Sequence, residues 1–188
     1  MTLTTERPPR TDRACAPVVL SASVLGTVVL ITAIAPLATD MYVPAFPLVG
    51  RDLSASAAQV QLTLTTFFVG MALGQLAGGP VSDRVGRRRP LLVALAVLAA
   101  ASVFCAFSPA IAVMMLARLV QGFSGGRAMV IARSVVVDLT GGVRLVRAMN
   151  VIAGVSGIAP IAGPLLGAAI LRFSTGACRS GWWRRWPG

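Results

Sequence analysis

The segment GPVSDRVGRRR, residues 79–89, decides the fold because of what surrounds it. The run before it, from Leu53 to Ser82, contains no charged residue, and the next charged residue after Arg89 is Arg118. Turn glycines and dense positive charge between two membrane-length apolar stretches are typical of a tight cytoplasmic hairpin. The sequence therefore predicts a helical protein that crosses a membrane several times.

Composition supports a membrane protein. The chain is 56% hydrophobic and only 12% charged, and its mean hydropathy is +0.80. So much apolar surface cannot be hidden in one soluble core. The net charge of +11 could indicate a nucleic-acid partner, but the arginines fall between apolar segments instead of forming a basic stripe. Positive-inside topology explains them better, and we expect a lipid bilayer and no nucleic acid.

Apolar runs predict an all-α polytopic bundle with about five transmembrane helices. We expect a cytoplasmic tail over residues 1–17 and a partial helical domain over 18–171. At about 1.5 Å per residue each long run crosses the roughly 30 Å hydrocarbon core. The second run has Gly70, Gly74 and Gly78 on one stripe, where a neighbouring helix can approach closely. The expected spans are 18–39, 57–77, 90–107, 110–137 and 148–171.

The distribution of arginine gives an orientation. Alternating the five spans places the N-terminus and the loops 79–89 and 138–147 on one side, which collects most of the extramembrane arginine. By the positive-inside rule this side is the cytoplasm. We therefore expect a multi-pass protein of the plasma (inner) membrane with a cytoplasmic N-terminus.

The last segment, residues 172–188, departs from this pattern. It holds four arginines and all three tryptophans, and no leucine, isoleucine or valine follows Leu171. Positive charge at this point lies on the wrong side for a sixth helix to follow. We expect a truncation or a shifted reading frame after about residue 173. The alternative is an aromatic anchor at the membrane interface.

The hairpin itself resembles the signature loop between the second and third helices of major facilitator superfamily transporters. Asp83 can accept hydrogen bonds from a facing helix N-terminus or pair with a nearby arginine, while the glycines permit a sharp reversal. The resemblance implies a conformational switch that locks the outward-facing state. The residues that carry it are Gly79, Asp83, Arg84, Gly86, Arg87 and Arg88.

Two further motifs narrow the resemblance. The stretch from Leu37 to Pro47 is similar to the end of helix one in the Bcr/CflA-type drug-resistance branch. Asp40 in it is either a proton-linked carboxylate or a solvated acid that ends the helix. Arg118 and Gln121 match a superfamily Arg-x-x-Gln-Gly motif, which implies proton coupling.

The fourth span contains arginines, and each of them needs a polar environment within the membrane. Arg118 should face the bundle interior and take a carboxylate or carbonyl partner, unless it merely extends to the interface. Arg127 stands where the branch pattern has a small residue. An extra charge at this depth costs a few kcal/mol, so Arg127 either lines a polar cavity or marks a damaged copy.

The fifth span carries Pro160, Gly163, Pro164 and Gly167, a pattern that resembles the antiporter motif of the superfamily. Proline removes a backbone donor and glycine permits close packing, so we expect these residues to break and bend the helix.

Together these resemblances imply proton-coupled efflux of drug-like small molecules, with protons as the counter-substrate and no cofactor or metal. Alternating access in the family uses two six-helix halves, and this chain would supply nearly five helices of the first. The alternative function is a membrane-embedded assembly subunit whose partner chain contributes the missing C-terminal half. An enzyme has little support, because the chain has no histidine, nucleophile elbow, phosphate loop or paired carboxylates.

Overall fold

A computed structural model describes residues 21–178, with side chains described as far as residue 170. All elements in this part are helical, which confirms the predicted all-α bundle. In chain order they are α1 (Ala22–Asp40), the 3-10 turn η1 (Val43–Ala45), α2 (Phe46–Asp52), α3 (Ala57–Val85), α4 (Arg88–Ala106), α5 (Ile111–Leu139) and α6 (Gly142–Cys178). Most of the atypical tail predicted over 172–188 lies outside the described residues.

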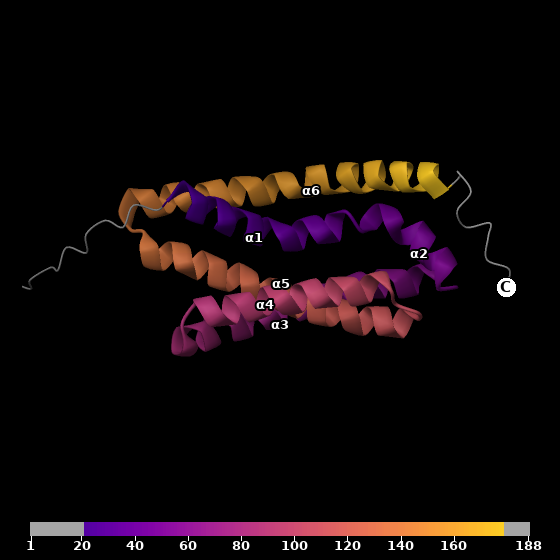
Figure 1. Cartoon of the computed structure of the whole chain (residues 1–188), viewed down its shortest axis with the longest axis horizontal. Helices are drawn as coiled ribbons and strands as arrows, with labels where there is room; N and C mark the ends of the chain where they lie inside the picture. Colours follow the sequence, from indigo (N-terminus) through magenta and orange to yellow (C-terminus); the bar gives the residue numbers. More distant parts are fainter. Residues whose placement is uncertain (1–20, 179–188) are drawn as a thin grey trace, which may run out of the picture.

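The helices form two groups, α1 with α6 and α3 with α4 and α5, and α1 connects them by also contacting α5. Figure 1 shows α1 running beside α6, while α3, α4 and α5 lie together below them. Helix α5 packs against α3 and α4, and α1 contacts both α5 and α6. The first and fourth predicted spans are therefore the two helices through which the groups meet.

Four elements of the described part are long and apolar enough to cross a membrane. They are the stretch Ala22–Asp52, helices α3 and α4, and α6 as far as Ile170. Helix α5 is not among these four, and Arg118, Arg127 and Arg133 all lie within it. Its central position explains how it tolerates Arg118 and Arg127, because most of its surface faces other helices instead of lipid, whereas Arg133 is exposed. The chain is a multi-pass helical membrane protein.

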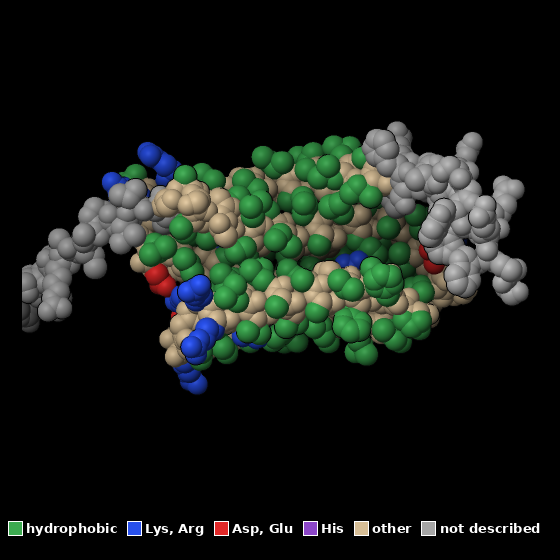
Figure 2. All heavy atoms as spheres, viewed as in Figure 1, with side chains coloured by type: hydrophobic (Ala, Val, Ile, Leu, Met, Phe, Trp, Pro, Cys, Tyr) green, Lys and Arg blue, Asp and Glu red, His purple; other side chains and the backbone are tan. Residues whose placement is uncertain are grey.

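The exterior separates apolar from charged surface. Figure 2 shows hydrophobic side chains over the middle of the bundle and arginines at the end where the α3–α4 and α5–α6 connections lie. Large apolar side chains such as Leu30, Leu76 and Phe104 are more than half exposed. In a bilayer these side chains contact lipid hydrocarbon instead of water, so their exposure carries no hydrophobic cost.

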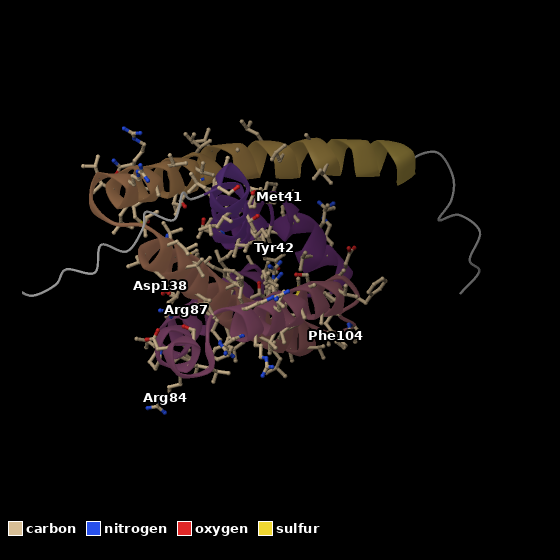
Figure 3. The ribbon with its side chains drawn as sticks, turned by 60° about the vertical axis from the view of Figure 1, so that its left-hand side comes forward. Met41, Tyr42, Arg84, Arg87, Phe104 and Asp138 are labelled. Atoms are coloured by element: carbon tan, nitrogen blue, oxygen red, sulfur yellow. The ribbon has the colours of Figure 1, made fainter. Side chains whose placement is uncertain are left out.

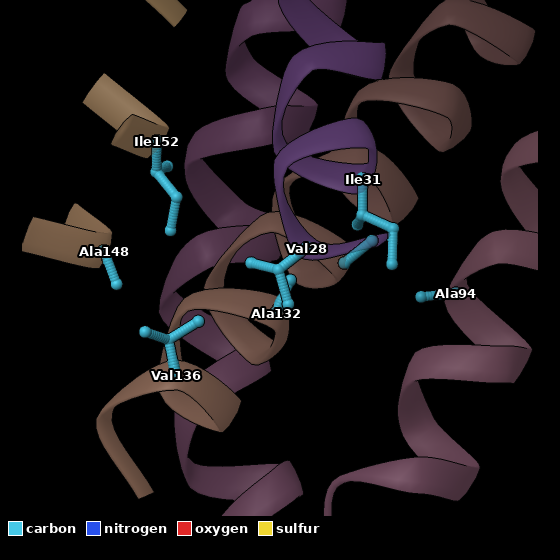
Figure 4. Packing of buried hydrophobic residues seen from close by; sticks show 8 residues of the cluster. Val28, Ile31, Ala94, Ala132, Val136, Ala148 and Ile152 are labelled. Carbon is cyan, nitrogen blue, oxygen red and sulfur yellow. The ribbon is translucent and has the colours of Figure 1, made fainter. Parts of the chain in front are cut away.

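The main apolar core lies where α1, α4, α5 and α6 converge. Figure 4 shows Val28 of α1 beside Ala132 of α5, with Ile31 on the side of Ala94 and Val136 on the side of Ala148 and Ile152. Alanine and valine dominate this cluster, so the backbones approach closely and dispersion contacts hold the helices together.

Glycines bring α3 and α5 into backbone contact, as the stripe at Gly70, Gly74 and Gly78 predicts. A Cβ on Gly74 would overlap the carbonyl group of Phe123. The contact is reciprocal, because a Cβ on Gly122 would overlap the carbonyl group of Phe67. Inside a lipid bilayer the hydrophobic effect does not drive helices together, and close packing at small residues takes its place.

The first helix ends at Asp40, close to the predicted end at residue 39, whereas the effect of proline in the fifth span differs from the prediction. Pro44 and Pro47 do not end the ordered structure: they begin η1 and α2, at positions where a missing N–H costs nothing. Helix α6 continues without interruption through Pro160 and Pro164, so the predicted break is wrong. In a membrane helix the surrounding hydrogen bonds hold the helical path past a proline.

Candidate functional site

The reversal between α3 and α4 is tighter than the predicted hairpin. Helix α3 continues to Val85 and α4 begins at Arg88, so only Gly86 and Arg87 connect them. Gly86 has a φ of +88°, a conformation that side-chain-bearing residues rarely adopt. Gly79 instead lies inside α3, and the turn is made at Gly86.

Arg87 joins the ends of three helices. Its Nη1 forms an ion pair with Asp83 Oδ1 at 2.5 Å and donates to Ser82 Oγ at 2.6 Å. Its Nε donates to Asp138 Oδ2, at the end of α5, over 2.9 Å. Figure 3 shows Arg87 and Asp138 close together, whereas Arg84 points away from them. Asp83 thus pairs with an arginine of its own loop.

These contacts stabilise the protonated form of Arg87. The hydrogen bond to Asp138 is the largest cause that raises the pKa of Arg87, and partial burial opposes it. Arg87 therefore stays protonated at any physiological pH. Arg84 and Arg88 are exposed and form no ion pair among the described side chains.

A second polar cluster is buried where α1, α3, α4 and α5 meet. Arg118 is only 7% exposed, and its Nη1 donates to Gln121 Oε1 over 3.0 Å. Gln121 Nε2 in turn donates to Ser102 Oγ of α4 over 2.9 Å. Arg118 thus faces the interior, and its partner is an amide carbonyl instead of a carboxylate.

Tyr42 completes this cluster. The guanidinium carbon of Arg118 lies 3.8 Å from the centre of the Tyr42 ring, and the Tyr42 hydroxyl is 3.1 Å from Thr63 Oγ1 of α3. A cation over an aromatic face is stabilised by the ring quadrupole, most strongly where water is excluded. Sequence reasoning missed Tyr42, although it is the only tyrosine of the chain and lies two residues after Asp40.

Asp40 lies apart from Arg118 and Gln121. It is the last residue of α1, and a Cβ on Gly163 of α6 would overlap its side chain. Gly167 approaches the backbone of Met41 in the same way. The ion pairs of the described residues both involve Arg87, so Asp40 and Arg118 are not joined by one.

The α6 motif presents its glycines to α1. Gly163 and Gly167 are buried in this contact, while Pro160 is exposed and Pro164 half-buried. Five predicted site residues therefore form two groups, with Asp40 and the two α6 glycines in one and Arg118 with Gln121 in the other.

Arg127 borders a groove whose walls are apolar, instead of the polar cavity that was one of the two alternatives. Its guanidinium carbon lies 5.6 Å from the centre of the Phe123 ring.

No three potential metal-ligating side chains lie together within the described ranges. The arrangement offers buried cationic and hydrogen-bonding groups and is suited to conformational or ionic coupling.

Comparison with the sequences of known proteins assigns the chain to a family. The model of the Major Facilitator Superfamily matches residues 28–185. The uncharacterized MFS-type transporter YdgK of Bacillus subtilis is 52% identical over 82 residues, which cover 44% of this chain and 20% of that protein. A chloramphenicol resistance protein of Pseudomonas aeruginosa is 47% identical over 73 residues, or 37% of this chain and 17% of that protein.

A bicyclomycin resistance protein homolog of Haemophilus influenzae is 42% identical over 71 residues, covering 38% of this chain and 18% of the relative. The aligned stretch is thus about a fifth of each of these relatives. The family match itself extends over most of the chain. With its helical membrane bundle, its charged α3–α4 turn and its buried α5 arginine, the chain belongs to the Major Facilitator Superfamily of membrane transporters.

Proposed function

We propose that the chain is part of a proton-coupled antiporter that exports drug-like small molecules by alternating access. Its relatives include proteins named for resistance to chloramphenicol and for bicyclomycin resistance, which supports an antibiotic or similar compound as substrate. In this proposal the substrate cavity is completed by helices beyond those of this chain, since alternating access requires two halves that rock about one site. The membrane is the plasma membrane, with the N-terminus in the cytoplasm.

The buried cluster around Arg118 is the observation that carries the proposal. A guanidinium in a membrane helix is costly and is retained where it lines a pathway or pairs with another group. Arg118 Nε is buried without a hydrogen-bond partner, so the cluster has unused capacity for an anionic group. This capacity suits a site whose interactions change during a transport cycle.

Asp40 is the proposed proton carrier. The chain contains neither histidine nor lysine, so a carboxylate must carry the proton. Asp40 is half-buried at the end of α1 and packs against α6. Tyr42, two residues further, contacts Arg118. A change in the charge of Asp40 would therefore alter the α1–α6 contact and, through the same short segment, the environment of Arg118.

Arg87 is the proposed conformational latch. It ties the α3–α4 turn to Asp138 at the cytoplasmic end of α5. Each partly exposed ion pair of this kind contributes only about 0–1 kcal/mol. Contacts of this strength hold one arrangement of helices and still allow it to open in each cycle.

Drug accumulation in cells tests the proposal. One strain expresses the chain alone, and a second expresses it fused to the rest of the Bacillus subtilis relative from its sixth helix onward, which preserves the alternation of spans across the membrane. We expect at least one strain to accumulate less of a fluorescent drug than empty cells, and an uncoupler to abolish the difference. Arg118→Ala should remove the efflux, whereas Arg51→Gln, at an exposed position, should not. Accumulation equal to that of empty cells in both strains, with the proteins inserted in the membrane, rejects the proposal.

A further inference from the structure

Arg127 is a half-buried charge for which the described residues provide no anion. Its Nε is buried and has no hydrogen-bond partner, and both ion pairs of the described part belong to Arg87. The Phe123 ring at 5.6 Å offers a cation–π contact at the limit of its useful range. An arginine within a membrane helix normally pairs with an acid or a carbonyl, and no side chain among the described residues provides one for Arg127.

This arginine borders a lateral groove of about 260 Å³. The floor of the groove is α5, and its walls are α3 and α4, which scarcely touch one another. Leu73 of α3 and Val93 of α4 form its rim and are 51% and 56% exposed. Because such apolar rim residues face the hydrocarbon in a membrane, the groove opens to lipid.

The polar end of the groove is directed toward the arginine-rich side of the protein. Arg127 packs against Gly78, and α3 continues only from there to Val85 before the charged turn. Seven residues of helix correspond to about 10 Å. An arginine side chain at this depth is long enough to reach the headgroup layer on that side.

We propose that this groove binds an anionic phospholipid of the cytoplasmic leaflet, with the lipid phosphate on Arg127 and an acyl chain between α3 and α4. Charge complementarity selects the headgroup, because a phosphate accepts hydrogen bonds from a guanidinium in a bidentate manner. The apolar walls select a lipid over a free anion. Basic pockets between membrane helices on the cytoplasmic side are a known form of lipid recognition. The inference depends on the membrane assignment and is independent of transport.

Native mass spectrometry of the full chain from detergent micelles tests this site. The micelles contain either phosphatidylglycerol or phosphatidylcholine with the same acyl chains. We expect retained phosphatidylglycerol on the wild type and an apparent affinity at least about tenfold higher than for phosphatidylcholine. Arg127→Gln should abolish the preference. Arg133→Gln is the matched control, because it removes one exposed arginine from the same helix outside the groove.

A groove-filling variant keeps the proposal testable if Arg127→Gln fails to fold. Val97→Trp retains the charge of Arg127 and obstructs the acyl chain, so it should lower phosphatidylglycerol retention about tenfold as well. Equal losses in Arg127→Gln and Arg133→Gln would show general electrostatic attraction and overturn the site. Displacement of the lipid by inorganic phosphate at equal concentration would overturn the assignment to lipid, as would unchanged retention in Val97→Trp.

Discussion

The guanidinium carbon of Arg118 lies 3.8 Å from the centre of the Tyr42 ring, and this contact fixes the turn that follows α1 to the first third of α5. Both side chains are buried, and Tyr42 also reaches Thr63 of α3 through its hydroxyl. The segment that follows Asp40 is thus anchored to the most polar part of the bundle interior. A displacement of α1 cannot leave Arg118 unaffected.

Replacing the Tyr42 ring should cost more than removing its hydroxyl. Tyr42→Phe keeps the cation–π contact and loses a hydrogen bond, for about 1 kcal/mol. Tyr42→Leu also leaves Arg118 without its aromatic partner, which adds about 2 kcal/mol for a desolvated site. Thermal unfolding in detergent measures both variants. Equal melting temperatures for the two variants would show that the ring contact contributes nothing.

A methyl group on the α3 glycine stripe should separate α3 from α5. Gly74→Ala places a Cβ against the Phe123 carbonyl and should destabilise the protein by about 1–3 kcal/mol. Gly154→Ala is the control, because it lies inside α6 with nothing within 4 Å of its Cβ position and no proline directly after it. There alanine should be neutral or stabilising by up to about 1 kcal/mol. Reversed effects in a denaturant titration would contradict the packing.

The Arg87–Asp138 link should behave as a true pair. Arg87→Ala and Asp138→Ala should each cost about 0.5–1 kcal/mol, and the double variant should cost less than the sum of both. The exposed Arg84, which forms no described ion pair, gives the control variant Arg84→Ala. A double-mutant cycle on unfolding free energies measures the coupling. Additive effects would mean that the two residues do not interact in solution.

Asp40→Asn should abolish proton coupling with little effect on folding. The variant keeps the shape of the side chain against Gly163 and removes the only carboxylate of α1. In whichever strain shows uncoupler-sensitive efflux, we expect at least a tenfold fall, about 1.4 kcal/mol or more. Asp52→Asn at an exposed position should keep the wild-type rate. Unchanged efflux in Asp40→Asn would remove Asp40 from the mechanism.

Most of the fold could be predicted from the sequence because a lipid bilayer restricts the length and the secondary structure of the segments that cross it. A charge-free run long enough to cross the hydrocarbon core has to be helical, and four such runs correspond to α1, α3, α4 and α6. The fourth predicted span corresponds to α5, which is helical although it carries three arginines. Helix ends were less accessible. Helix α3 continues past its predicted end at residue 77 to Val85, because charged residues at an interface are solvated and need not end a helix.

The candidate site was only partly accessible. Motif spacing indicated Arg118, Gln121 and Arg87, but their partners depend on how helices distant in sequence pack. Arg87 and Asp138 are far apart in the chain, and Tyr42 is brought to Arg118 by the packing of α1 on α5. Asp40 was grouped with Arg118 by its proposed role, whereas α6 is the helix it contacts.

Labelling of single cysteines in intact cells tests the central claim most directly. Cys15, Cys105 and Cys178 are replaced by serine, and one cysteine is introduced at Arg84 in the α3–α4 turn or at Asp52 at the end of α2. A membrane-impermeant maleimide should label the Asp52 position in intact cells and the Arg84 position only after permeabilisation. Labelling of the Arg84 position in intact cells, or of both positions equally, would contradict a membrane bundle with its arginine-rich turn in the cytoplasm.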